Sequence, residues 1–154
     1  MRRRLLLGAA LPVASLLVLG CGPASRSAAV TSGRYCLTAR AVRDSYASLN
    51  DFGAATTIQQ LKSALAVITD RVGTADAVAP ENIALEWHTI RRLAEASNAA
   101  VQSATDIPSA GQAAQRALAG EQGNADAAAS RIDAYTRTAC GFVVTIPGPS
   151  SAAR

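Results

Sequence analysis

The sequence predicts an all-α domain: an antiparallel four-helix bundle, with one short extra helix as a further element, closed by one disulfide. Apolar residues recur at steps of three and four in four separate segments, the connections between them are short, and two cysteines stand at the outer ends of the first and fourth segments. Such steps place side chains on one face of a helix, and short connections favour antiparallel neighbours.

The two central segments show the clearest helical spacing. In residues 56–72 the apolar face comprises Ile58, Leu61, Leu65, Ile68 and Val72. In residues 80–104 the corresponding face comprises Ile83, Trp87, Ile90, Ala94, Ser97 and Val101. Pro80 followed by Glu81 suits a first helical turn, because proline needs no amide partner there and an acidic group meets the positive end of the helix dipole.

The two outer segments are less sharply patterned. Residues 36–52 place Ala39, Val42, Tyr46 and Leu49 on one stripe, with Gly53 as a natural stop. Residues 124–140 place Ala125, Ala128, Ile132, Tyr135 and Ala139 on another, with Gly141 as a C-terminal cap. Between the third and fourth segments, residues 108–123 have room for a short helix around Gly111 to Leu118.

Alanine is frequent on these predicted seams, so helix propensity is high while each residue buries little apolar area. Tyr46, Trp87 and Tyr135 fall on the seams and fill space that the alanines leave. We interpret them as core residues first, with contact to a ligand as the alternative. Residues 142–146 are apolar and β-branched, and we expect them to lie against the bundle; a short exposed strand is the rival interpretation.

Residues 1–20 have the anatomy of a signal peptide. Three arginines follow the initial methionine, and residues 5–19 carry no charge. A membrane-spanning helix needs about 20 apolar residues, and this run is shorter and contains Gly8 and Pro12. A permanent transmembrane anchor is therefore the weaker interpretation, and we exclude the segment from the fold.

The boundary "VLGC", residues 18–21, resembles the lipobox of bacterial lipoproteins, in which a small residue precedes an invariant cysteine. Leu19 departs from the commonest pattern, which has a smaller residue there. The resemblance implies cleavage after Gly20 and acylation of Cys21, and two or more acyl chains anchor a protein stably. The alternative is plain cleavage that leaves Cys21 as an ordinary thiol. "RRRLL" also resembles a twin-arginine export signal, and the choice of export route stays open.

Acylation of Cys21 leaves two of the three cysteines, Cys36 and Cys140, to form a disulfide. The start of the first helix and the end of the fourth meet at one end of an up-down bundle, and an extracytoplasmic location preserves disulfides. Two free structural thiols are the alternative. The expected organisation is a signal peptide (1–20), a lipidated flexible tether (21–34), a helical bundle domain (35–146) and a disordered tail (147–154).

Several classes of function are disfavoured by the composition. Without Arg2, Arg3 and Arg4 the chain has 12 basic and 11 acidic residues, which leaves no electrostatic footprint for nucleic acid. His88 is the only histidine, and we interpret it as a solvated helix-surface residue. Arg91 and Arg92 extend a small basic cluster around it, again interpreted as a solvated face.

Catalytic and cofactor motifs are not recognised either. Glu86 precedes His88 by two residues, a spacing unlike the Glu-x-x-His pairs of di-iron bundles. With the cysteines committed, a zinc site lacks ligands, and no nucleophile elbow or phosphate loop occurs. We expect no catalytic residues, no metal and no cofactor.

The chain resembles the small helical lipoproteins of actinobacteria, in its lipobox and, more loosely, in a cysteine pair around an alanine-rich helical region. Lys62 is the only lysine among 15 basic residues, which suggests a GC-rich coding sequence. The expected function is a non-catalytic interaction module, anchored on the extracytoplasmic face of the cell membrane, that binds an envelope protein or polymer. The alternatives are a carrier or sensor of a small apolar or lipid ligand and an enzyme of unrecognised type.

Overall fold

The computed structural model describes residues 24–53 and 55–146, with side chains from Gly33 onward. Within these residues the secondary structure is helical throughout, which confirms the predicted all-α class. The α-helices are α1 (Ala24–Ala47), α2 (Ile58–Ala77), α3 (Ala84–Gln102), α4 (Ile107–Ala117) and α5 (Gln122–Cys140). Two short 3-10 helices, η1 (Ser48–Asp51) and η2 (Glu81–Ile83), precede α2 and α3.

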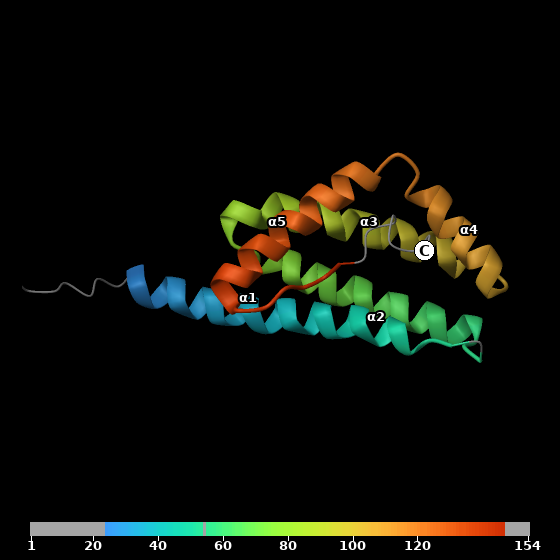
Figure 1. Ribbon diagram of the computed structural model, residues 1–154, viewed down its shortest axis with the longest axis horizontal. Helices are drawn as coiled ribbons and strands as arrows, with labels where there is room; N and C mark the ends of the chain where they lie inside the picture. The colour runs from blue at the N-terminus through green and yellow to red at the C-terminus, as the bar shows by residue number, and fades with distance from the viewer. Residues whose placement is uncertain (1–23, 54, 147–154) are drawn as a thin grey trace, which may run out of the picture.

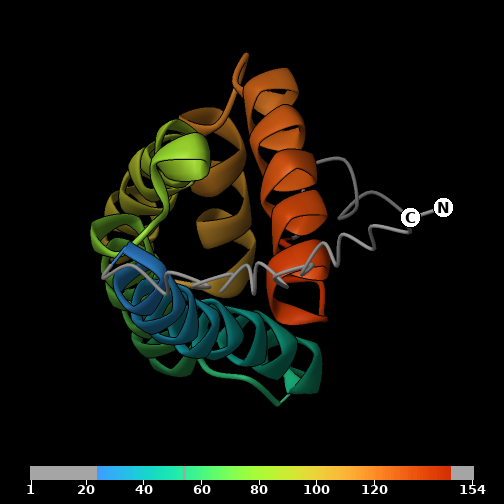
Figure 2. The same cartoon turned by 90° about the vertical axis from the view of Figure 1, so that its left-hand side faces the viewer.

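The helices pack around one main core and one smaller cluster. α1 contacts α2 and α5, while α3 contacts α2, α4 and α5. α1, α2 and α3 extend along the long axis of the molecule, and α5 runs obliquely to them (Figures 1 and 2). α4 lies at the end of the molecule opposite the end of α5 (Figure 1). The short helix predicted between the third and fourth segments is therefore present as α4.

The first helix is longer than the sequence pattern predicts. α1 begins at Ala24 rather than at Cys36, so residues 24–34, predicted as part of a flexible tether, are helical instead. This stretch contains no proline that would break the helix, and its three alanines favour helix. α1 also ends at Ala47, and η1 carries the chain on toward Gly53.

Side-chain caps fix the starts of α2 and α4. The Gln60 amide donates to the Thr57 hydroxyl at 3.3 Å, and the Thr57 amide donates to the Gln60 side chain at 2.7 Å. At α4 the Ser109 amide donates to Asp106 at 2.8 Å, and the Asp106 amide donates to the Ser109 hydroxyl. These reciprocal bonds satisfy amides that a helix leaves without intrahelical partners.

The main core is centred on aromatic side chains from three helices. Trp87 of α3 and Tyr35 of α1 are fully buried, and the indole N–H of Trp87 donates to the Tyr35 hydroxyl at 3.0 Å. The rings of Tyr35 and Tyr135 meet edge to face, with their centroids 5.6 Å apart. The prediction that Trp87 is a core residue is confirmed. Tyr135 is partly buried and packs against this core. Ala139, predicted on the same stripe as Tyr135, is exposed.

Residues 141–146 return along the helices without forming a strand. Gly141 has a φ of 76°, the left-handed conformation of a C-terminal cap, as predicted. The amides of Val144 and Thr145 donate to the Asp133 carboxylate at 2.9 and 3.1 Å. Val144 is fully buried in the main core, and Ile146 packs against this core. The prediction that residues 142–146 lie against the helices is therefore confirmed.

Candidate functional site

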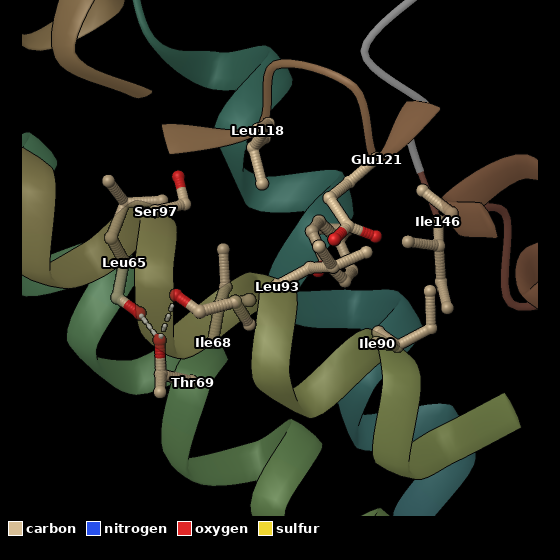
Figure 3. A pocket seen from close by; sticks show the side chains of 12 residues that line it. Leu65, Ile68, Thr69, Ile90, Leu93, Ser97, Leu118, Glu121 and Ile146 are labelled. Carbon is tan, nitrogen blue, oxygen red and sulfur yellow. Dashed lines mark hydrogen bonds between the residues drawn. The ribbon is translucent and has the colours of Figure 1, made fainter. Parts of the chain in front are cut away.

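A cavity of about 150 Å³ lies where α1, α2, α3 and α5 converge. α2 and α3 supply most of its wall, and the turn between α4 and α5 and the C-terminal segment complete it (Figure 3). Its lining comprises Tyr46, Leu65, Ile68, Thr69, Ile90, Leu93, Ala94, Ser97, Leu118, Glu121, Ala125 and Ile146. Several of these residues belong to the stripes predicted from helical spacing, and the void among them was not predicted.

The polar groups of the cavity differ in how many hydrogen bonds they already form within the protein. The Thr69 hydroxyl donates to the Leu65 carbonyl at 2.8 Å, an intrahelical bond that occupies its proton (Figure 3). The Ala94 carbonyl of α3 lies 3.5 Å from the same hydroxyl. Ser97 faces the cavity one helical turn further along α3. Thr69 therefore contributes mainly its methyl group and an accepting oxygen to the lining.

Tyr46 is the aromatic member of the lining. It packs against the main core, which confirms the core interpretation, and it also lines the cavity. Contact of Tyr46 with a ligand stays a prediction. Burial raises the pKa of its phenol to about 12, because an ionised phenolate loses its hydration there. Its hydroxyl forms no hydrogen bond to any residue in the described part of the chain. Among the described residues, Arg91 Nε is the only buried side-chain nitrogen or oxygen without a hydrogen-bond partner, so the Tyr46 hydroxyl is not a buried unpartnered group.

Glu121 carries the acidic group of the cavity, in the turn between α4 and α5. Its carboxylate lies between Leu118 and Ile146 in the view of Figure 3. Arg92 donates to both of its oxygens, at 3.3 and 3.1 Å, and Asn124 donates at 3.0 Å. These bonds, with Arg92 first, lower the pKa of the Glu121 carboxyl, so the group is ionised at neutral pH and its charge is matched by Arg92.

The small basic cluster predicted as a solvated face of the third helix is exposed to solvent, and each of its three side chains also lies beside an acidic residue. Arg91 Nη1 lies 3.0 Å from Asp76 Oδ2, and His88 Nδ1 lies 3.7 Å from the same oxygen. Arg91 Nε is 3.4 Å from Glu95 Oε1 without hydrogen-bond geometry, so this buried nitrogen stays unbonded. His88 itself is on the surface, as predicted, with its side chain 58% exposed.

The predicted cysteine pairing is present in the structure. Cys36 of α1 and Cys140, the last residue of α5, form a disulfide with their Cα atoms 5.5 Å apart, inside the usual range for such bridges. Cys36 lies within α1 rather than at its start. Cys21, the predicted lipidation site, and the signal peptide lie outside the described residues, as does the tail 147–154.

Two further observations concern metals and membranes. In residues 24–53 and 55–146 no group of three or more potential ligands is placed to hold a metal ion. No helix of this part of the chain is long and apolar enough to cross a membrane. Comparison with protein-family models, curated proteins and solved structures finds no match for the chain.

The sequence analysis did not identify the acidic residues of the cavity and of the basic cluster on α3. Asp76 lies near the end of α2, and Glu121 lies in a turn. No local sequence pattern around either residue predicts its basic partner. A third case is Glu86, which is buried and accepts from Arg131 of α5 at 2.9 Å. These pairs join residues far apart in the sequence, so only the packing of the helices brings them together.

Proposed function

We propose that this protein is a lipid-anchored lipoprotein of the extracytoplasmic face of the cell membrane, and that its helical domain is a non-catalytic interaction module. The observation that carries the proposal is the Cys36–Cys140 disulfide. Disulfides persist in oxidising compartments outside the cytoplasm. Of the three cysteines this leaves Cys21, directly behind the apolar run, for acylation.

The contacts between helices support the finer architecture of this module. α1 contacts α2, α2 contacts α3, α3 contacts α5, and α5 contacts α1. This closed ring of neighbours is the arrangement that we propose as an antiparallel four-helix bundle, with α4 as the additional short helix. The disulfide joins the first and last members of the ring.

Two features support a non-catalytic role for the module. The carboxylate nearest to His88 belongs to Asp76, and it lies closer to Arg91 than to the imidazole. A histidine oriented for general base catalysis needs a carboxylate committed to it. In addition, Leu37 and Leu85 are more than two-thirds exposed, at 71% and 74%, and contact with an envelope protein or polymer would remove this apolar area from water.

The anchor is tested by comparing the wild-type chain with Cys21→Ser in cells of an acylating bacterium. We expect wild type in the membrane fraction, with acyl mass on Cys21 and two hydrogens fewer than the reduced chain. Cys21→Ser should keep the disulfide and lose both the acyl mass and the membrane retention. Ser25→Ala is the matched control, because it changes a nearby residue and leaves the thiol intact. Unchanged processing and partitioning of Cys21→Ser would overturn the proposal.

The cavity favours a second candidate function, a carrier or sensor of a small apolar ligand. Its volume of about 150 Å³ is that of cavities which accept a benzene-sized molecule. Pockets for drug-sized ligands occupy about 300–1,000 Å³. The size therefore favours a small apolar ligand over a whole lipid.

A further inference from the structure

We propose that the cavity between α1, α2, α3 and α5 binds a small uncharged ring compound that carries one hydroxyl group. Phenol is the simplest probe of this class. The inference deepens the second candidate function and does not depend on the lipid anchor. Three properties of the cavity lead to it: its size, the chemistry of its wall and the state of its polar groups.

The wall selects an apolar molecule. Most of the lining residues are aliphatic, and Ile68, Ile90 and Leu93 among them are buried. An apolar wall gains little from water and gains contacts from an apolar occupant.

The polar groups select a hydroxyl and disfavour a charge. Tyr46 has a hydroxyl that bonds to no described residue, and the Glu121 carboxylate accepts from Arg92 and Asn124 with accepting capacity remaining. A ligand hydroxyl can accept from Tyr46 or donate to Glu121. A ligand anion would lose hydration against an apolar wall that contains no basic residue, whereas a ligand cation would compete with Arg92 for the Glu121 carboxylate.

The experiment is a titration of the oxidised full chain in lipid nanodiscs with 4-fluorophenol, followed by fluorine NMR. Empty nanodiscs measure the part of the signal that comes from partitioning into lipid. We expect saturable binding of one equivalent above that background, and no saturable binding of 4-fluorobenzoate, the charged analogue. Absence of saturable 4-fluorophenol binding, or equal binding of the benzoate, would overturn the proposal.

Two variants locate the binding in this cavity. Ala94→Leu adds side-chain volume to the lining and should weaken binding by at least about tenfold, since overfilled cavities exclude ligands. Ala96→Leu is its matched control on the exposed side of α3 and should bind like wild type. Equal binding by wild type and a folded Ala94→Leu would overturn the assignment.

Tyr46→Phe keeps the ring and removes the hydroxyl, so it tests the polar contact even if Ala94→Leu does not fold. Loss of one hydrogen bond should weaken 4-fluorophenol binding about three- to tenfold and leave fluorobenzene binding unchanged. An equal loss for both compounds, or no loss for either, would contradict the role of the hydroxyl. We expect these variants to keep the membrane retention of wild type. If no ligand binding is found, the lipoprotein proposal is still tested separately by Cys21→Ser.

Discussion

At one end of the domain, the disulfide and the packed rings of Tyr35, Trp87 and Tyr135 join α1, α3 and α5. At the other end α4 packs mainly on α3, through a smaller apolar cluster that includes aliphatic residues of α2. We call the first region the disulfide end and the second the α4 end. The buried residues of the α4 end are Val101, Ala104 and Ala110.

The comparison shows how unevenly stability is distributed in a chain rich in alanine. Large rings and a covalent bond restrict the disulfide end, while the α4 end has a smaller buried cluster and the cap at Asp106. Regions with few buried apolar contacts open at lower free energy. The cavity borders the α4 end, since Leu118 and Glu121 of its lining follow α4, so opening of the α4 end would expose it.

The largest expected effect comes from removing the disulfide. Cys36→Ser/Cys140→Ser should lower the free energy of unfolding by up to about 4.7 kcal/mol, the chain-entropy value for a loop of about 100 residues; the bridge here spans a separation of 104. Urea unfolding followed by circular dichroism measures the loss. Cys21→Ser is the control and should match wild type. A double variant as stable as wild type would show that the rings alone hold this end.

A smaller effect is expected from the hydrogen bond between the two largest buried rings. Tyr35→Phe should cost about 1 kcal/mol, because the Trp87 N–H loses its acceptor in a buried site. Tyr135→Phe is the control, since its hydroxyl has no hydrogen bond among the described residues. Equal losses in both variants would assign the effect to packing and not to the bond.

The same tyrosine makes the disulfide end sensitive to alkali. Burial raises the pKa of Tyr35 from its ordinary value of 10.0 to about 12, although the Trp87 hydrogen bond acts in the opposite direction. A raised pKa in the folded state gives stability that is complete below pH 10 and is lost as the pH rises toward 12. Wild type should therefore lose more stability over this window than Tyr35→Phe, measured by urea unfolding at each pH. The pKa of Tyr46 is also raised, so ionisation of Tyr46 accounts for part of the stability that Tyr35→Phe still loses in this pH range.

The smallest and most local effect is expected at the α4 end. Asp106→Ala removes the acceptor for the Ser109 amide, so amides in the first turn of α4 should exchange with deuterium faster. Exchange in α1 and α5 near the disulfide should not change. Asp126→Ala, an exposed acidic residue in α5, serves as the control. Faster exchange spread evenly over all helices would abolish the distinction between the two ends.

Helices and their inward faces could be predicted because they depend on local spacing. Ile68, Val72, Ile90 and Ile132 all lie on predicted stripes and are buried. Tyr35 was missed because it precedes the predicted helix start, although it is fully buried. The helical continuation back to Ala24 has no apolar stripe to mark it, and composition alone suggested a tether.

The candidate site was predictable only in part. Tyr46 stood on a seam, and ligand contact was its alternative interpretation. The cavity itself depends on how closely four helices approach, and small side chains suggested close packing rather than a void. Glu121 and its partner Arg92 are 29 residues apart. Helical periodicity cannot predict that a residue in a turn will contact a side chain of an earlier helix.

The position of the bridge between Cys36 and Cys140 has a consequence for proteolysis. Every connection from η1 to the start of α5 lies between these two cysteines. A protease that cuts any one of them produces two fragments that remain covalently attached. Damage of this kind leaves the apparent mass on a non-reducing gel unchanged, and a reducing agent is needed before the separate pieces can be seen.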